Sequence, residues 1–137
     1  MPIETALRIH LPNRRGELAR VARQLANAGV NIRTIAGLTV GNEGTVELLV
    51  DDPARASQAL KQAGANFEQA RVIVSPIPSQ VRDTPGTLAQ LADILAEAGI
   101  NIESLYTTAG QGGQLQGVLG CDNPEKAEPL LASWGKA

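Results

Sequence analysis

The sequence of 137 residues has few of the residue types on which many binding and catalytic sites depend. Aromatic residues make up only 2% of the chain, namely Phe67, Tyr106 and Trp134. RNA-binding sheets stack bases on aromatic side chains, so this scarcity argues against nucleic-acid binding. The net charge of −2 argues in the same direction, because it offers no general attraction for a polyanion. Aliphatic side chains must therefore fill the core.

Cysteine and histidine occur once each, as Cys121 and His10. A single cysteine excludes an intrachain disulfide and favours a reducing compartment. No histidine lies at a spacing that suggests activation of Cys121, so a buried or strand-end thiol is the simpler interpretation. His10 has no cysteine or carboxylate cluster at metal-ligand spacing, and we expect it to be solvated. The sequence therefore predicts no metal site, no cofactor and no enzymatic activity.

Long apolar runs are also missing. No stretch of 18 apolar residues occurs, so no membrane-spanning helix is expected. The first five residues carry no apolar run of the kind found in signal peptides. With 43% hydrophobic and 19% charged residues, the composition is that of a soluble globular protein. We expect a cytoplasmic protein.

The chain does contain an internal repeat. Residues 13–19 (NRRGELA) correspond to residues 83–89 (DTPGTLA), and residues 28–32 (AGVNI) correspond to residues 98–102 (AGINI). An offset of 70 positions is too long for a solenoid repeat and indicates two copies of one small unit. We place the first unit at residues 1–75 and the second at residues 76–137.

The first unit is predicted to run strand, helix, strand, strand, helix, strand. Its strands are expected at residues 6–11, 30–39, 45–50 and 67–74, from their alternating or β-branched patterns. Asp52 is a good N-cap for the second helix, with Pro53 at the first helical position. Gly29 and Gly64 are expected to end the helices. The apolar faces of the two helices are Leu18, Val21, Ala22 and Leu25, and Ala56, Ala59, Leu60 and Ala63.

The second unit repeats this order, with a hairpin at residues 110–113 and a last helix that opens at Asn123. Its first helix carries the same stripe as Leu88, Leu91, Ala92 and Leu95. The sequence ends after the last helix, so the second unit is expected to lack its fourth strand. The fold class is therefore α+β: two ferredoxin-like βαββαβ units, each with an antiparallel sheet covered by helices on one face.

These motifs resemble ACT domains. The resemblance rests on a turn that ends at Pro85-Gly86 and a Leu-Ala helix followed by the residues 98–102. The first copy keeps Gly16 and Asn31 but has Arg15 where the family usually has proline. The resemblance covers nearly the whole chain and is to small stand-alone proteins made of two ACT units.

The resemblance implies a non-enzymatic regulatory protein that binds an amino acid between paired units. The open sheet faces and the missing strand of the second unit favour a homodimer. A metabolic enzyme is the other expected partner. The family's ligand contacts lie in the turn after the first strand and at the start of the second strand. Carried over by position, they are Asn13, Gly16, Asn31 and Ile32 in the first unit, and Asp83, Thr84, Pro85, Gly86, Asn101 and Ile102 in the second.

The chemistry of these residue types suits a free amino acid. The start of a helix offers unpaired N–H groups and partial positive charge to a carboxylate, and Gly16 and Gly86 let a ligand approach the backbone. Asp83 or Asn13 is suited to accept from the ammonium, and the amides of Asn31 and Asn101 both donate and accept. Arg14 and Arg15 make the first site more cationic, so we expect two unequal sites.

A purely structural interpretation accounts for the same residues. Asn13 and Asp83 are good helix caps, the two glycines suit tight turns, and Asn31 and Asn101 suit helix-to-strand corners. Asp51 and Asp52 read most simply as charges at a helix start. The alternative function is then a ligand-independent interaction module that docks on, or regulates, a metabolic enzyme.

Overall fold

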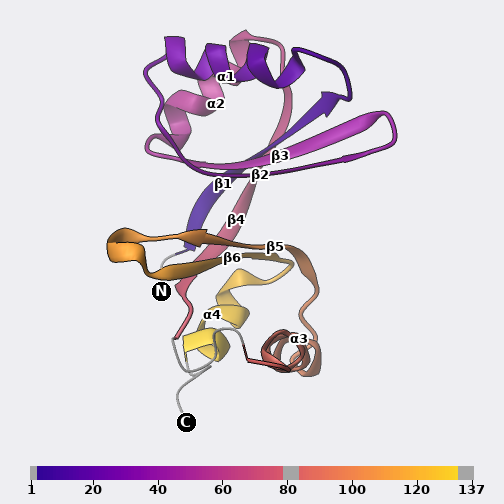
Figure 1. The fold of residues 1–137 in the computed structure, drawn as a ribbon, viewed down its shortest axis with the longest axis vertical. Helices are drawn as coiled ribbons and strands as arrows, with labels where there is room; N and C mark the ends of the chain where they lie inside the picture. The colour runs from indigo at the N-terminus through magenta and orange to yellow at the C-terminus, as the bar shows by residue number, and fades with distance from the viewer. Residues whose placement is uncertain (1–2, 79–83, 133–137) are drawn as a thin grey trace. The chain divides into compact units, whose positions relative to one another are not determined.

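The computed structural model describes residues 3–78 and 84–132. The chain divides into two compact units. Thr5–Ala70 form one, which we call the N-terminal unit, and Met1–Glu4 with Arg71–Ala137 form the other, which we call the C-terminal unit. Figure 1 shows the chain coloured from one end to the other.

The N-terminal unit has the predicted order of elements. They are β1 (Ile3–Pro12), α1 (Glu17–Asn27), β2 (Ile32–Val40), β3 (Glu43–Val50), α2 (Pro53–Gln62) and the first half of β4 (Asn66–Pro76). The strands lie in the order β2-β3-β1-β4. β3 is antiparallel to β1 and to β2, with Ile9 opposite Val46 and Gly37 opposite Val46. Both helices cover the same face of these strands (Figure 1).

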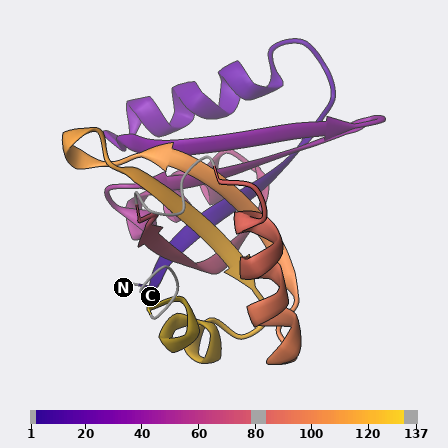
Figure 2. The same cartoon turned by 60° about the horizontal axis from the view of Figure 1, so that its bottom comes forward.

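The C-terminal unit repeats this architecture. The second half of β4 is followed by α3 (Thr87–Glu97), β5 (Ile102–Ala109), a short 3-10 turn (Gln111–Gly113), β6 (Leu115–Cys121) and α4 (Pro124–Ala132). β6 is antiparallel to β4 and to β5, with Ser75 and Thr107 both opposite Gly117. Figure 2 shows α3 and α4 beside the β5–β6 hairpin. The predicted class, α+β with antiparallel strands and helices, is confirmed.

Each unit has its own aliphatic core between helices and strands. In the N-terminal unit Leu25 and Leu60, from the helices, are fully buried against Leu7 and Leu48 from the strands. In the C-terminal unit the corresponding cluster includes Ile73, Leu95, Leu119 and Leu131. None of the described helices is long and apolar enough to cross a membrane.

The prediction that Leu18 and Leu88 belong to the buried faces of their helices is wrong. Their side chains are 47% and 63% exposed, whereas Val21 and Leu25, and likewise Leu91 and Leu95, are buried. Leu18 and Leu88 stand in the first turn of α1 and α3, where each borders a cavity between its helix and the strands. The helical period is thus kept, but its first position falls outside the core.

The expected lack of a fourth strand in the second unit concerns the residues after α4, and residues 133–137 lie outside the described part of the chain. The C-terminal unit does include Met1–Glu4. Ile3, at the beginning of β1, packs against the core that contains Ile73 and Leu119. The first residues of the chain thus contribute to the core of the unit formed by its last half.

The loop between the first strand and the first helix differs in length between the units. Leu7 lies opposite Leu48 in the first unit, and Ile73 lies opposite Leu119 in the second. Leu7 and Ile73 are therefore equivalent strand positions, and they are 66 residues apart. The helix starts, Gly16 and Gly86, are 70 residues apart. The second loop is therefore four residues longer, which the repeat motifs conceal because they lie on the helix side of the loop.

Gly16 and Gly86 each turn the chain from loop into helix. Both are the N-caps of their helices, with left-handed φ values of 88° and 92°. A Cβ atom at either position would meet no other atom within 4 Å. The glycine is therefore required by the backbone conformation and not by crowding.

We expect Gly86→Ala to lower the free energy of unfolding by about 1–2 kcal/mol, because a side chain disfavours the left-handed conformation. Urea unfolding followed by circular dichroism measures the change. Gly37→Ala is the matched control, because Gly37 lies in a strand without a positive φ and a Cβ there would be 3.5 Å from its nearest neighbour. Equal effects of the two substitutions would contradict the conformational explanation.

Candidate functional site

The four helices begin in two different ways. α2 and α4 are capped by their own side chains: Asp52 accepts from the N–H of Arg55 at 3.1 Å, and Asn123 from the N–H of Lys126 at 3.2 Å. α1 and α3 begin at Gly16 and Gly86 and have no side-chain cap. The N–H groups of Glu17 and Thr87 donate to the carbonyls of Arg14 and Thr84 at 3.4 and 3.3 Å. No described side chain caps the other N–H groups of each first turn, which therefore suit an external acceptor, as the predicted ligand sites require.

The structural interpretation of Asn13 as a helix cap is wrong. Its side-chain amide donates to the carbonyl of Gly41 at 2.9 Å, and its backbone N–H donates to the carbonyl of Asn42, also at 2.9 Å. Asn13 thus ties the loop before α1 to the β2–β3 hairpin. Asp83, its counterpart by sequence, lies outside the described residues, and the N-cap of α3 is Gly86.

The first turns of α1 and α3 differ in charge. In α1, Glu17 lies between Arg14 and Arg20, with N–O distances of 3.4 and 3.3 Å. The matching residue in α3 is Thr87, whose hydroxyl donates to the carbonyl of Thr84 at 2.9 Å. The start of α1 therefore already holds a carboxylate, whereas the described first turn of α3 holds none.

Asn31 and Asn101 lie at the other end of these helices. The N–H of Asn31 donates to the Asp51 carboxylate at 3.0 Å, and the N–H of Asp51 returns to the Asn31 carbonyl at 3.1 Å. Asn101 and Asp122 repeat this pair at 3.0 and 3.2 Å. Both asparagine side chains are exposed.

The sequence did not predict that Asp51 and Asp122 accept hydrogen bonds from the backbone of the two asparagines. Asp51 was assigned to the helix start, but only Asp52 caps α2, while Asp51 fixes the backbone of Asn31. The sequence did contain a signal, because Asp51 follows Asn31 at nearly the same spacing as Asp122 follows Asn101. Its meaning depends on β3 returning beside β2, which only the fold establishes.

Within one unit the predicted contacts form two groups. Thr84, Pro85 and Gly86 precede α3, whereas Asn101 and Ile102 follow it. α3 has 11 residues, so the two groups lie about 16 Å apart at 1.5 Å per residue. The first unit separates Asn13 and Gly16 from Asn31 and Ile32 in the same way. Ile32 and Ile102 are half-buried and pack against the cores of their units.

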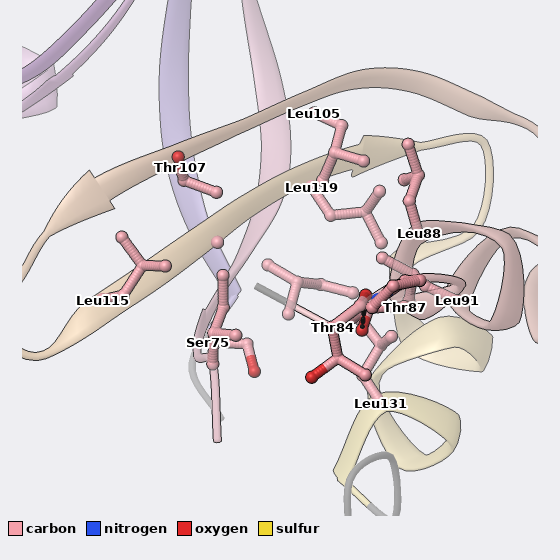
Figure 3. Close-up of a pocket in the computed structure, with 14 residues that line it drawn as sticks. Ser75, Thr84, Thr87, Leu88, Leu91, Leu105, Thr107, Leu115, Leu119 and Leu131 are labelled. Atoms are coloured by element: carbon pink, nitrogen blue, oxygen red, sulfur yellow. Dashed lines mark hydrogen bonds between the residues drawn. The ribbon is translucent and has the colours of Figure 1, made fainter. Parts of the chain in front are cut away.

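A cavity of about 500 Å³ opens in the C-terminal unit beneath the start of α3. Figure 3 shows side chains from the strands and from both helices converging on it, with Leu88, Leu91, Leu105 and Leu119 among them. Thr84, Pro85 and Thr87 also line it, so it adjoins the uncapped helix start. At the matching place in the N-terminal unit, between α1 and the strands, the cavity measures about 110 Å³.

The remaining candidate residues have ordinary structural surroundings. His10 is half-buried on the face away from the helices, 3.4 Å from both the Glu68 carboxylate and the Thr45 hydroxyl. Glu125, in the first turn of α4, is hydrogen-bonded to Arg71, which lowers the pKa of its carboxyl. The described residues contain no group of three or more histidine, cysteine, aspartate or glutamate side chains placed to hold a metal ion.

Comparison with known proteins identifies the fold. A family model described as an ACT domain pair matches residues 1–133. Protein BT0572 from Bacteroides thetaiotaomicron is similar in structure, with a TM-score of 0.78 and 26% identity over 96% of this chain and 88% of that one.

Two regulatory subunits of aspartate kinase have the same fold at lower identity. The subunit from Thermus flavus has a TM-score of 0.68 and 19% identity, over 96% of this chain and 93% of that one. The ligand-free subunit from Thermus thermophilus has a TM-score of 0.65 and 18% identity, over 97% and 93%. No curated protein matches the sequence significantly.

Cys121 is the last residue of β6, and its side chain is buried in the core of the C-terminal unit, as the sequence predicts. Burial raises the pKa of its thiol. Because the thiolate is the reactive form, we expect iodoacetamide at pH 8 to alkylate Cys121 roughly tenfold or more slowly than the same cysteine in guanidinium-unfolded protein. Mass spectrometry of timed samples measures both rates, and equal rates would contradict the burial of this thiol.

Proposed function

Because the chain belongs to the family of ACT domain pairs, we propose that it is a cytoplasmic regulatory protein without enzymatic activity that binds a free amino acid. The observation that carries the proposal is the uncapped start of α3 at Gly86. An N-terminal helix turn that lacks its own acceptor has N–H groups and partial positive charge to offer to the ligand carboxylate.

The ligand ammonium requires acceptors, which the described start of α3 offers as backbone carbonyls and the hydroxyls of Thr84 and Thr87. Asn101 has an exposed side-chain amide and a backbone fixed by Asp122, but it lies at the far end of the helix. Two copies of the chain that pack side by side about a two-fold axis perpendicular to α3 have antiparallel α3 helices. This arrangement brings Asn101 of one copy to Gly86 of the other, and so completes one site from two chains.

Exposed apolar side chains along the edge strands support association with a second copy. β2 and β5 each have one neighbouring strand, β3 and β6 respectively. Ile35 on β2 is 55% exposed and Leu105 on β5 is 39% exposed, beside Leu18 and Leu88 on the helices. Unpaired strand edges with apolar side chains favour pairing with another chain.

The two sites are proposed to be unequal. A ligand carboxylate at the start of α1 would compete with Glu17 for the same positive helix end and for Arg14 and Arg20. The start of α3 has Thr87 at that position, so its described first turn holds no acidic side chain. Electrostatics therefore favours the site at α3.

The alternative function is a ligand-independent module that docks on a metabolic enzyme. Leu38 and Val40, at the end of β2, are 72% and 74% exposed, which is the observation that favours it. The aspartate kinase structures are of regulatory subunits, which makes an enzyme partner a reasonable candidate for this protein also. Binding to such a partner that is independent of any amino acid would favour this alternative.

We expect at least one of the twenty amino acids, at millimolar concentration, to stabilise the protein. A ligand of micromolar affinity contributes about 4 kcal/mol at that concentration through mass action. A thermal-shift screen at pH 7, followed by calorimetry of any hit, measures the effect. Asn101→Ala should remove the response and Asn31→Ala, the matched variant, should retain it. No response to any amino acid would overturn the proposal.

We expect Thr87→Glu to weaken amino-acid binding at least tenfold, because it introduces at α3 the carboxylate that Glu17 places at α1. The stability of the helix should not fall, since an acidic residue in a first turn is favourable by about 0.3–1 kcal/mol. Calorimetric titration with the amino acid found in the screen measures the change.

Two controls separate charge from other effects of this substitution. Thr87→Val removes the hydroxyl without adding charge and should retain most of the affinity. Glu17→Thr makes the reverse change in the N-terminal unit and should not weaken binding. Equal loss of binding in Thr87→Val and Thr87→Glu would show that the carboxylate is not the cause.

A further inference from the structure

One row of residues across the helix-facing side of the sheet differs sharply between the units. In the N-terminal unit the row is Ile9, Val46 and Gly37, paired through β3. In the C-terminal unit the same register gives Ser75, Gly117 and Thr107, paired through β6. Ser75 and Gly117 therefore have much less aliphatic volume than Ile9 and Val46, their counterparts in the N-terminal unit.

This exchange accounts for the larger cavity. Ile9 and Val46 are buried and fill the space between the strands and α1, where about 110 Å³ remains. Ser75 and Gly117 leave the equivalent space open beneath α3, and the cavity there is about 500 Å³. A void of about 150 Å³ admits benzene, and ligand pockets typically measure about 300–1,000 Å³. Of these two matching cavities, formed by described residues, the one in the C-terminal unit is therefore large enough for a ligand group.

The lining of this cavity selects against charge. Leucine and isoleucine side chains form most of it, and no charged side chain is among the described residues that line it. Of its four hydroxyl-bearing residues, Ser75 donates to the carbonyl of Pro76 and Thr87 to that of Thr84. A charged side chain placed there would lose its hydration without gaining an oppositely charged partner among the described lining residues.

We propose that this cavity receives the side chain of the bound amino acid, and that the ligand therefore carries a bulky, uncharged, apolar side chain of the size of leucine or phenylalanine. The proposal rests on the proposed function for the amino-acid head group, and on the cavity for the side chain. Thr84, Pro85 and Thr87 line both the cavity and the surface at the start of α3, so the two places adjoin. Leu88, which is 63% exposed and lines the same cavity, gains a contact when the ligand is bound.

The test is a set of titrations of the full chain with ligands that differ in one feature. L-leucine and L-phenylalanine carry the proposed side chains, L-alanine lacks the bulk, and L-lysine and L-aspartate carry charge. The acid 4-methylpentanoate has the apolar group of leucine without the amino group. We expect leucine or phenylalanine to bind at least tenfold more tightly than alanine, and the charged amino acids not to bind in the same range.

Gly117→Val restores the residue of the N-terminal unit and fills the cavity. A Cβ at Gly117 would be 3.6 Å from Ile77, an ordinary contact, so the substitution is compatible with folding. We expect it to weaken leucine or phenylalanine binding at least tenfold without lowering the melting temperature of the free protein. Ser75→Ile fills the same space from β4 and serves as the second variant. Gly37→Val adds the same side chain in the matching row of the N-terminal unit and should leave binding unchanged.

The outcomes separate this inference from the proposed function. Stabilisation by a charged or small amino acid that Gly117→Val and Ser75→Ile leave intact would retain the function and overturn the inference. Binding of 4-methylpentanoate but not of leucine, lost in Gly117→Val, would retain the apolar cavity and overturn amino-acid binding. No binding of any of these compounds would overturn the inference, and no response to any of the twenty amino acids would overturn the proposed function as well. Nuclear Overhauser contacts from ligand methyls to Leu91 and Leu119 would place the side chain directly, and their absence with a bound ligand would contradict the inference.

Discussion

The architecture depends on burial of the helix-facing side of each set of strands. Leu25 and Leu95, one helical turn after Val21 and Leu91, are fully buried against their strands. With almost no aromatic residues, each core obtains its stability from many small aliphatic contacts, about 0.8 kcal/mol for each buried methylene. This packing holds the helices in place, and the helices in turn position the loops at Gly16 and Gly86 and the corners at Asn31 and Asn101.

The row that contains Ser75 and Gly117 is an exception to this close packing, because it leaves a cavity between the strands and α3. The N-terminal unit shows that Ile9 and Val46 fit the same framework and close the space. In a packed core, large-to-small changes of this kind cost about 2–5 kcal/mol when the surroundings do not collapse. Departures from good local packing are expected at functional sites, where something other than stability is selected. The open space in the C-terminal unit is accordingly better explained by a ligand than by poor packing.

Much of the fold followed from the sequence, because helical periodicity, turn residues and the internal repeat are local signals. Gly29 and Gly64 follow the ends of α1 and α2 with left-handed φ values of 76° and 69°, as predicted for residues in that position. What was not predicted depends on register between distant strands. The pairs Asn31–Asp51 and Asn101–Asp122, and the row through Gly117, exist only once β2 and β5 have been paired with their neighbours. The exposure of Leu18 and Leu88 was also missed, because the period of a helix does not reveal a cavity between the helix and its strands.

Two differences between the units bear on separate parts of the ligand and favour the same site. Glu17 against Thr87 changes the charge at the helix end where the carboxylate is proposed to bind. Val46 against Gly117 changes the volume available to the side chain. Neither difference follows from the other, because the first lies in the first turn of a helix and the second lies on a strand beneath it. A site in the N-terminal unit would need both changes reversed, so the two copies of the repeat are unequal through charge and through volume independently.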